Sequence, residues 1–141
     1  MIGFTSPEQR FPEGGEMLTR EPIPSRGDFI AVVGLSETPA PSEALRRARE
    51  YVPDLPVAFL AVPGLAVPLV PDLVRSDHAP FWHAGIPAVM ITDTGNFRNP
   101  NYHQESDTPE TIDFEFATRV SRLALAATLL LAERTMPLAR G

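Results

Sequence analysis

The residues that could do chemistry in this chain are imidazoles and carboxylates gathered in one stretch. All three histidines, His78, His83 and His103, lie between residues 75 and 108, and the chain contains no cysteine. A catalytic zinc ion would therefore need His, Asp or Glu ligands, about three protein groups and an open position for water. On the residues alone, His103 fits this chemistry or is an ordinary histidine of a surface loop.

The consecutive residues Ser76, Asp77 and His78 contain the residue types of a serine hydrolase triad. Three consecutive side chains point in different directions, and the sequence has no G-x-S-x-G turn, so a triad is excluded. His83 follows His78 by five residues, about 140° around a helix, so the two cannot share a metal ion from a regular helix.

Several motifs of this stretch resemble, in combination, the C-terminal part of the M28 zinc aminopeptidases. They are Ser-Asp-His-Ala-Pro-Phe at 76–81, Gly-Ile-Pro-Ala at 85–88, Asp-Thr at 93–94 and Tyr-His-Gln-Glu-Ser-Asp-Thr at 102–108. The resemblance extends to residues 27–34 and to residues 1–3, and so covers nearly the whole chain.

The resemblance implies roles for four of these residues. His103 occupies the position of the family's last zinc-binding histidine. Asp107 would orient that loop or the histidine, although it could equally be a turn residue. His78 would donate a hydrogen bond to the oxyanion that develops on the substrate carbonyl, and Asp77 would hold the loop. The alternative is that Asp77 only caps a short helix and His78 is exposed on it.

Other residues of the stretch could line a substrate pocket. Asp93, Asn96 and Arg98 fall in the long polar loop after a predicted strand, where binding sites are often built. Arg98 could recognise a carboxylate, with a solvated loop arginine as the alternative. Phe81 and Trp82 fit a pocket wall or the core.

The activity that the resemblance implies is hydrolysis of N-terminal peptide bonds by two zinc ions, a bridging water and a glutamate base. In the family, an aspartate ligand directly precedes the motif found at residues 1–3, and further ligands lie upstream. We therefore expect residues 1–141 to be the C-terminal portion of one M28-type domain, inactive in isolation. The alternatives are a glutaminyl-cyclase-like zinc acyltransferase and a non-catalytic binding module of the same fold.

Strands alternating with helices position these residues, which indicates an α/β fold. The family fold is a mixed β-sheet between helices, of the zinc-exopeptidase type. The predicted strands are residues 29–33, 57–62 and 86–92, and the predicted helices are 42–52, 77–84 and 113–134. We expect Gly34 to close the first strand, Gly85 to end helix 77–84 and Asp113 to cap helix 113–134. Residues 66–74 are predicted to be a loop with a short strand. Strands 29–33 and 86–92 are apolar on both faces and need cover on both sides. Because few helices are available, we expect an uncovered sheet surface and self-association.

Composition narrows the partners. The net charge of −6 and the lack of a basic run argue against nucleic acid as a partner. The resemblance to the M28 family implies a peptide substrate. No apolar stretch has the length of a membrane span, and the first residues lack the features of a signal peptide. Relatives of the family are often secreted or periplasmic, so the compartment stays open. The polar, Pro/Gly-rich segment 5–26 is predicted to be a loop.

Overall fold

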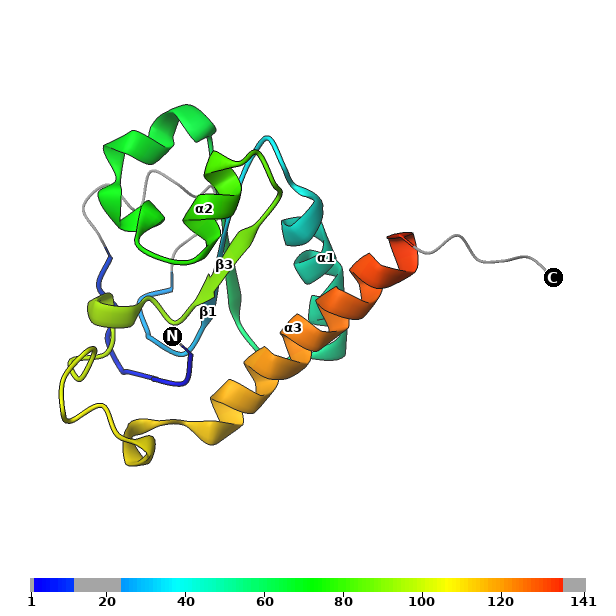
Figure 1. Ribbon diagram of the computed structural model, residues 1–141. Helices are drawn as coiled ribbons and strands as arrows, with labels where there is room; N and C mark the ends of the chain where they lie inside the picture. The colour runs from blue at the N-terminus through cyan, green and yellow to red at the C-terminus, as the bar shows by residue number, and fades with distance from the viewer. Residues whose placement is uncertain (1, 12–23, 136–141) are drawn as a thin grey trace.

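The computed structural model describes residues 2–11 and 24–135 and contains one mixed β-sheet (Figure 1). The strands are β1 (Ile30–Leu35), β2 (Val57–Val62) and β3 (Val89–Thr92), in the order β2-β1-β3. β1 pairs in parallel with β2 and antiparallel with β3. A mixed sheet with helices is the α/β class that the sequence predicts.

Among the described residues, three α-helices accompany the sheet: α1 (Ala40–Ala48), α2 (His78–His83) and α3 (Phe114–Thr135). The predicted cap of α3 is confirmed, because Asp113 Oδ1 accepts a hydrogen bond from the Phe116 N–H at 2.8 Å. Short 3₁₀ helices fill the connections. They are η2 (Arg49–Tyr51), η3 (Gly64–Leu69), η4 (Pro71–Val74), η5 (Gly95–Phe97) and η6 (Pro109–Thr111).

The two faces of the sheet are covered by different parts of the chain. Ile30 and Val32 of β1 belong to a buried cluster with residues of α1 and α3. Val33 points the other way and packs with Leu73 and Trp82, on the side of η4 and α2 (Figure 1). Successive residues of a strand point to opposite faces, so β1 is buried on both, as its apolar sequence requires.

The predicted end of the first strand is wrong. The strand does not close at Gly34 but continues to Leu35. A Cβ atom on Gly34 would lie 2.7 Å from Ser42 Oγ and 3.0 Å from Val89 Cγ1. Gly34 therefore permits a close approach of β1 to α1 and β3, and does not terminate the strand.

The predicted strand 86–92 is shorter and less buried than expected. It begins at Val89, and its four residues are only partly buried because β3 lies at an edge of the described sheet. Residues 86–88 remain attached to α2: the Ile86 N–H donates to Phe81 O at 2.8 Å and Trp82 Nε1–H donates to Ala88 O at 2.9 Å. Gly85, with φ +70°, makes the turn that ends α2, as predicted.

Two further predictions concern the connections between helices and strands. Residues 66–74, predicted as a loop with a short strand, instead contribute to η3 and η4. The predicted loop 5–26 falls partly outside the described residues; its ends pair through an antiparallel bridge between Ser6 and Gly27.

Within residues 2–11 and 24–135, no helix has the length and hydropathy needed to cross a membrane.

Candidate functional site

The loop that follows β3 is anchored by a fully buried carboxylate, that of Asp93. Its Oδ2 accepts a hydrogen bond from the Phe4 N–H at 3.0 Å, and its Oδ1 accepts one from the Gly95 N–H at 3.2 Å. A buried charge needs such partners to offset lost hydration. Asp93 thereby fixes the N-terminal segment beside the start of the polar loop.

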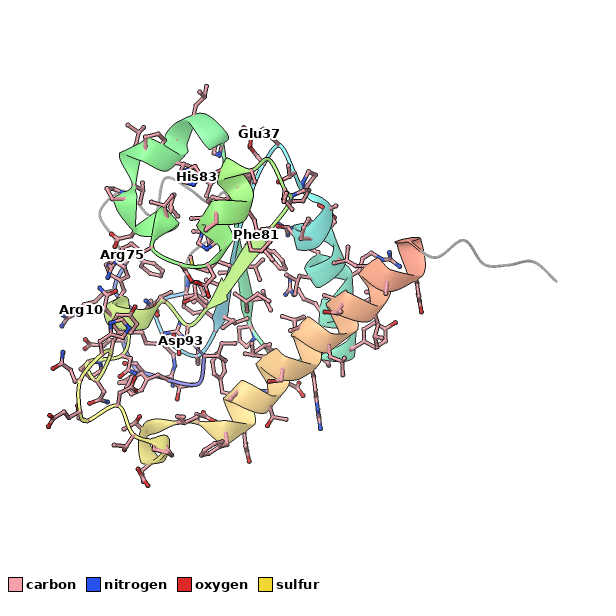
Figure 2. The ribbon with its side chains drawn as sticks, viewed as in Figure 1. Arg10, Glu37, Arg75, Phe81, His83 and Asp93 are labelled. Atoms are coloured by element: carbon pink, nitrogen blue, oxygen red, sulfur yellow. The ribbon has the colours of Figure 1, made fainter. Side chains whose placement is uncertain are left out.

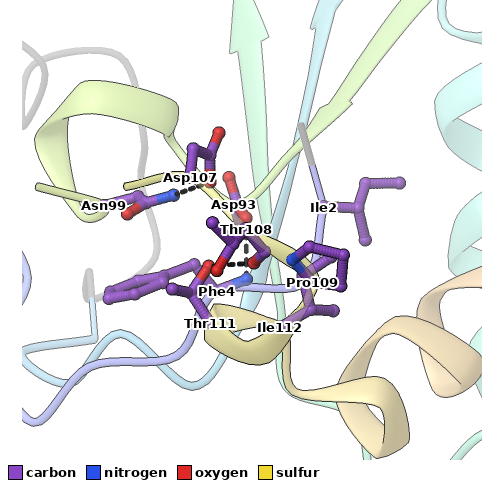
Figure 3. A pocket seen from close by; sticks show the side chains of 10 residues that line it. Ile2, Phe4, Asp93, Asn99, Asp107, Thr108, Pro109, Thr111 and Ile112 are labelled. Atoms are coloured by element: carbon purple, nitrogen blue, oxygen red, sulfur yellow. Dashed lines mark hydrogen bonds between the residues drawn. The ribbon is translucent and has the colours of Figure 1, made fainter. Parts of the chain in front are cut away.

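A pocket of about 230 Å³ lies at this junction (Figure 3). It is lined by Ile2, Gly3, Phe4, Asp93, Asn99, Asp107, Thr108, Pro109, Thr111 and Ile112. Across it, Asn99 Nδ2 donates to Asp107 Oδ1 at 3.2 Å. Of the residues predicted to line a substrate pocket, only Asp93 contributes to this one; Asn96, Arg98 and Phe81 do not.

His78 is buried at the start of α2, with 6% of its surface exposed, so the alternative of an exposed histidine is wrong. Its Nε2 lies 2.7 Å from Leu73 O, and since a carbonyl can only accept, Nε2 carries the proton. Burial lowers the pKa of His78, opposed by the Leu73 hydrogen bond and the charge of Asp77. Trp82 packs edge-on against the ring, with centroids 4.4 Å apart.

In this arrangement the ring Nε2–H of His78 donates to the Leu73 carbonyl. The role of His78 as a hydrogen-bond donor to an oxyanion stays a prediction. Asp77 is exposed and precedes α2 without a side-chain capping hydrogen bond, so the alternative that it caps the helix is wrong. The holding role of Asp77 also stays a prediction.

His103 is exposed on the polar loop, in the left-handed backbone region with φ 57°. Its ring stacks on Tyr102, with centroids 3.9 Å apart and planes inclined by 15°. Asp107 is hydrogen-bonded to Asn99, so it ties together the two ends of the segment that carries His103. This agrees with a loop-orienting role for Asp107, while metal binding by His103 stays a prediction.

Arg98 is not the solvated arginine offered as its alternative, because only 5% of its surface is exposed. Its Nη1 donates to Phe29 O at 2.8 Å, and its Nε donates to Gln9 Oε1 at 2.6 Å. Burial lowers the pKa of Arg98 to about 10, against the opposing charges of Asp93 and Asp28, so the guanidinium stays charged at neutral pH. The guanidinium is hydrogen-bonded to other residues of the protein, and recognition of a substrate carboxylate by Arg98 stays a prediction.

Asn96 and Phe81 are both exposed, but they lie on different segments. Phe81 belongs to α2, before β3, and Asn96 belongs to the loop after it; Figure 2 shows Phe81 and Asp93 toward opposite ends of that strand. The structure therefore gathers Asp93, Arg98 and Asn99 at one place and leaves Phe81 at another.

Sequence reasoning missed Gln9 and Asn99. Gln9 bonds to Arg98 and to Thr94 Oγ1, at 2.8 Å for the latter, and nothing in its local sequence signals these distant partners. Asn99 had a signal, since its Oδ1 accepts from the Asn101 N–H at 2.8 Å, which is the Asx turn that an Asn-Pro-Asn run favours.

The predicted zinc site would need about three His, Asp or Glu side chains close together. No three His, Asp or Glu side chains gather into a possible metal site in the part of the chain that the structure describes. One exposed imidazole does not complete a zinc coordination shell. The described residues alone therefore do not form a complete zinc site.

The sequence of residues 66–128 matches peptidase family M28. The matched segment contains α2, β3 and the loop with His103. The chain is M28 peptidase-like. Over 97 residues it is also 37% identical to the uncharacterized protein YfbL of Escherichia coli K12. The aligned residues cover 69% of this chain and 29% of YfbL.

Two crystal structures of LapA from Legionella pneumophila, one described as an aminopeptidase, share the fold of this M28-like chain. Each superposes with a TM-score of 0.55 and 24% identity over 74% of the chain. This chain spans only 27% and 26% of those two chains. The similarity supports the α/β architecture.

Proposed function

We propose that this chain contributes the His103-bearing part of a metal-dependent aminopeptidase. The observation that carries the proposal is the M28 match over residues 66–128, which includes the whole segment around His103. A peptidase function is the part that this similarity supports directly. Specificity for N-terminal peptide bonds goes further, and the fold shared with the LapA aminopeptidase supports it. Zinc dependence rests on the resemblance of the His103 segment to the M28 family.

The residues of this chain have separate tasks in the proposal. His103 would bind the metal through its imidazole ring, and Asp107 and Asn99 hold the ends of its loop together. Bound zinc would supply a polarised water at neutral pH as the nucleophile. The remaining ligands come from residues outside the described set. Asn96, exposed on the same loop, is available to contact the peptide.

The test is expression of the protein from its natural reading frame, with any residues that precede Met1 included. We expect cleavage of an aminoacyl-p-nitroanilide that a chelator abolishes and zinc restores. His103→Ala should lose this activity, because it removes a metal ligand. His83→Ala is the matched control, since His83 is also exposed, and it should keep the activity.

Three outcomes would contradict the proposal in different ways. Cyclisation of an N-terminal glutaminyl peptide without peptide-bond hydrolysis would indicate the glutaminyl-cyclase alternative. Peptide binding without turnover, unchanged by chelator, would indicate the non-catalytic binding module. Full activity of a folded His103→Ala variant would also remove His103 from the site.

A further inference from the structure

We propose that Arg98 is a positioning residue for His103, acting through the turn at Gly95 and the ring of Tyr102. The inference rests on the proposed function, in which His103 binds the metal. Tyr102 lies four positions after Arg98 and His103 one position further, so all three belong to one short segment.

Arg98 is the anchor because it bonds to three separate parts of the chain. Its guanidinium donates to Phe29 O at the entry to β1, to Gln9 Oε1, and to Phe4 O at 3.4 Å. It also lies over the ring of Phe29, 4.5 Å from the centroid. A planar group with several fixed donors suits such bridging, which a lysine cannot reproduce.

Space for this side chain is provided by Gly27. A Cβ atom there would lie 2.9 Å from both Cδ and Nε of Arg98, closer than real contacts allow. The Arg98 side chain therefore lies close against the Gly27 backbone, and with 5% of its surface exposed it has little room to move. The backbone at residue 98 is therefore held at a defined position relative to β1, and so is the turn that contains it.

The turn that Arg98 anchors carries Tyr102. The backbone N–H groups of Arg98 and Asn99 both donate to Gly95 O, at 3.0 and 2.8 Å, and the Tyr102 N–H donates to Asn99 O at 3.2 Å. Gly95 has φ +55°, and a Cβ atom on it would lie 3.3 Å from Tyr102 Cε2. Because Gly95 has no side chain, the Tyr102 ring can pack close to the backbone of the turn.

Tyr102 in turn determines where the imidazole lies. The two rings stack at 3.9 Å, although His103 itself is exposed and has a left-handed backbone. An exposed side chain is normally free to change rotamer, at an entropic cost when a ligand fixes it. Stacking on a ring that is itself fixed reduces that cost before the metal arrives.

Nuclear magnetic resonance of the three histidine rings in the 141-residue chain tests the inference. The ring current of Tyr102 should displace the His103 proton signals from those of exposed His83. We expect Arg98→Lys and Gly95→Ala to move the His103 signals toward those of His83, with the signals of buried His78 unchanged. Arg47→Lys, at an exposed arginine of α1, and Gly64→Ala are the matched controls and should leave His103 unaffected.

Unchanged His103 signals in a folded Gly95→Ala variant would overturn the inference, even if Arg98→Lys fails to fold. Adding zinc to the wild-type chain separates this result from the proposed function. If the variants move the His103 signals but zinc does not, the positioning stands and the metal-binding role fails. If zinc moves them and neither variant does, the positioning fails alone.

Discussion

His78 is a buried imidazole whose protonation should affect stability. Burial lowers its folded pKa below the ordinary value of 6.5, so the unfolded chain binds a proton more readily. The contribution of His78 is complete above pH 6.5 and is lost as the pH falls toward the folded pKa. The unfolding free energy should therefore decrease between about pH 7 and pH 5.

Denaturant unfolding across this pH range measures the effect. His78→Gln keeps a donor for the Leu73 carbonyl but does not titrate, so its stability should depend less on pH than that of the wild type. An equal or steeper pH dependence in this variant would contradict the assignment.

At the scale of single residues, sequence reasoning succeeded where the signal is local and failed where it is distant. The Asp113 cap and the turn at Gly85 depend on neighbouring residues, and both were predicted. The burial of Arg98 depends on Phe29 and Phe4, which are 69 and 94 positions away along the chain. No local pattern contains that information, so its solvated alternative was wrong.

The start of the helix α3 is capped by Asp113. The carboxylate accepts from the Phe116 N–H and, at 3.3 Å, from the Thr5 hydroxyl. We expect Asp113→Ala to lower the unfolding free energy by about 1 kcal/mol, through loss of the cap. Asp113→Asn retains an acceptor and should cost less. Equal stability of Asp113→Ala and the wild type in denaturant would show that the cap contributes nothing.

The close approach of β1, α1 and β3 depends on Gly34. A methyl group there would press on Ser42 and Val89, so Gly34→Ala should cost about 1–3 kcal/mol, as overpacking does. Gly64→Ala is the control, because its Cβ would lie an ordinary 3.6 Å from Glu37 Oε1. Similar thermal midpoints for the two variants would mean that the elements separate without cost.

Element types were predicted well, and the boundaries of edge elements less well. The strand at residues 57–62 matches β2, and the helix predicted at 113–134 matches α3 closely. The error at β3 arises because apolar sequence indicates burial but does not say where pairing stops. Residues 86–88 are taken up by contacts with α2 instead of the sheet.

For the whole molecule, we predict self-association of the 141-residue chain. Both outer strands, β2 and β3, pair with β1 on one side and with no other strand among the described residues. Large apolar side chains are also exposed, including Leu65 at 93% and Leu69 at 80%. Free strand edges and apolar patches favour association.

Analytical ultracentrifugation over a concentration series measures this directly. We expect the average mass to rise with concentration. Leu65→Ser combined with Leu69→Ser should reduce the rise if the apolar surface contributes. A monomer at every concentration, with one cooperative thermal transition, would contradict the prediction.

A zinc titration of the 141-residue chain, followed through the signals of its three histidine rings, tests whether His103 is a metal ligand. We expect His103 to respond first and binding to be far weaker than at a complete site, because the described residues supply no three-ligand group. His103→Ala should remove the response. Tight binding by this chain, or a response at His78 or His83 with none at His103, would contradict the account.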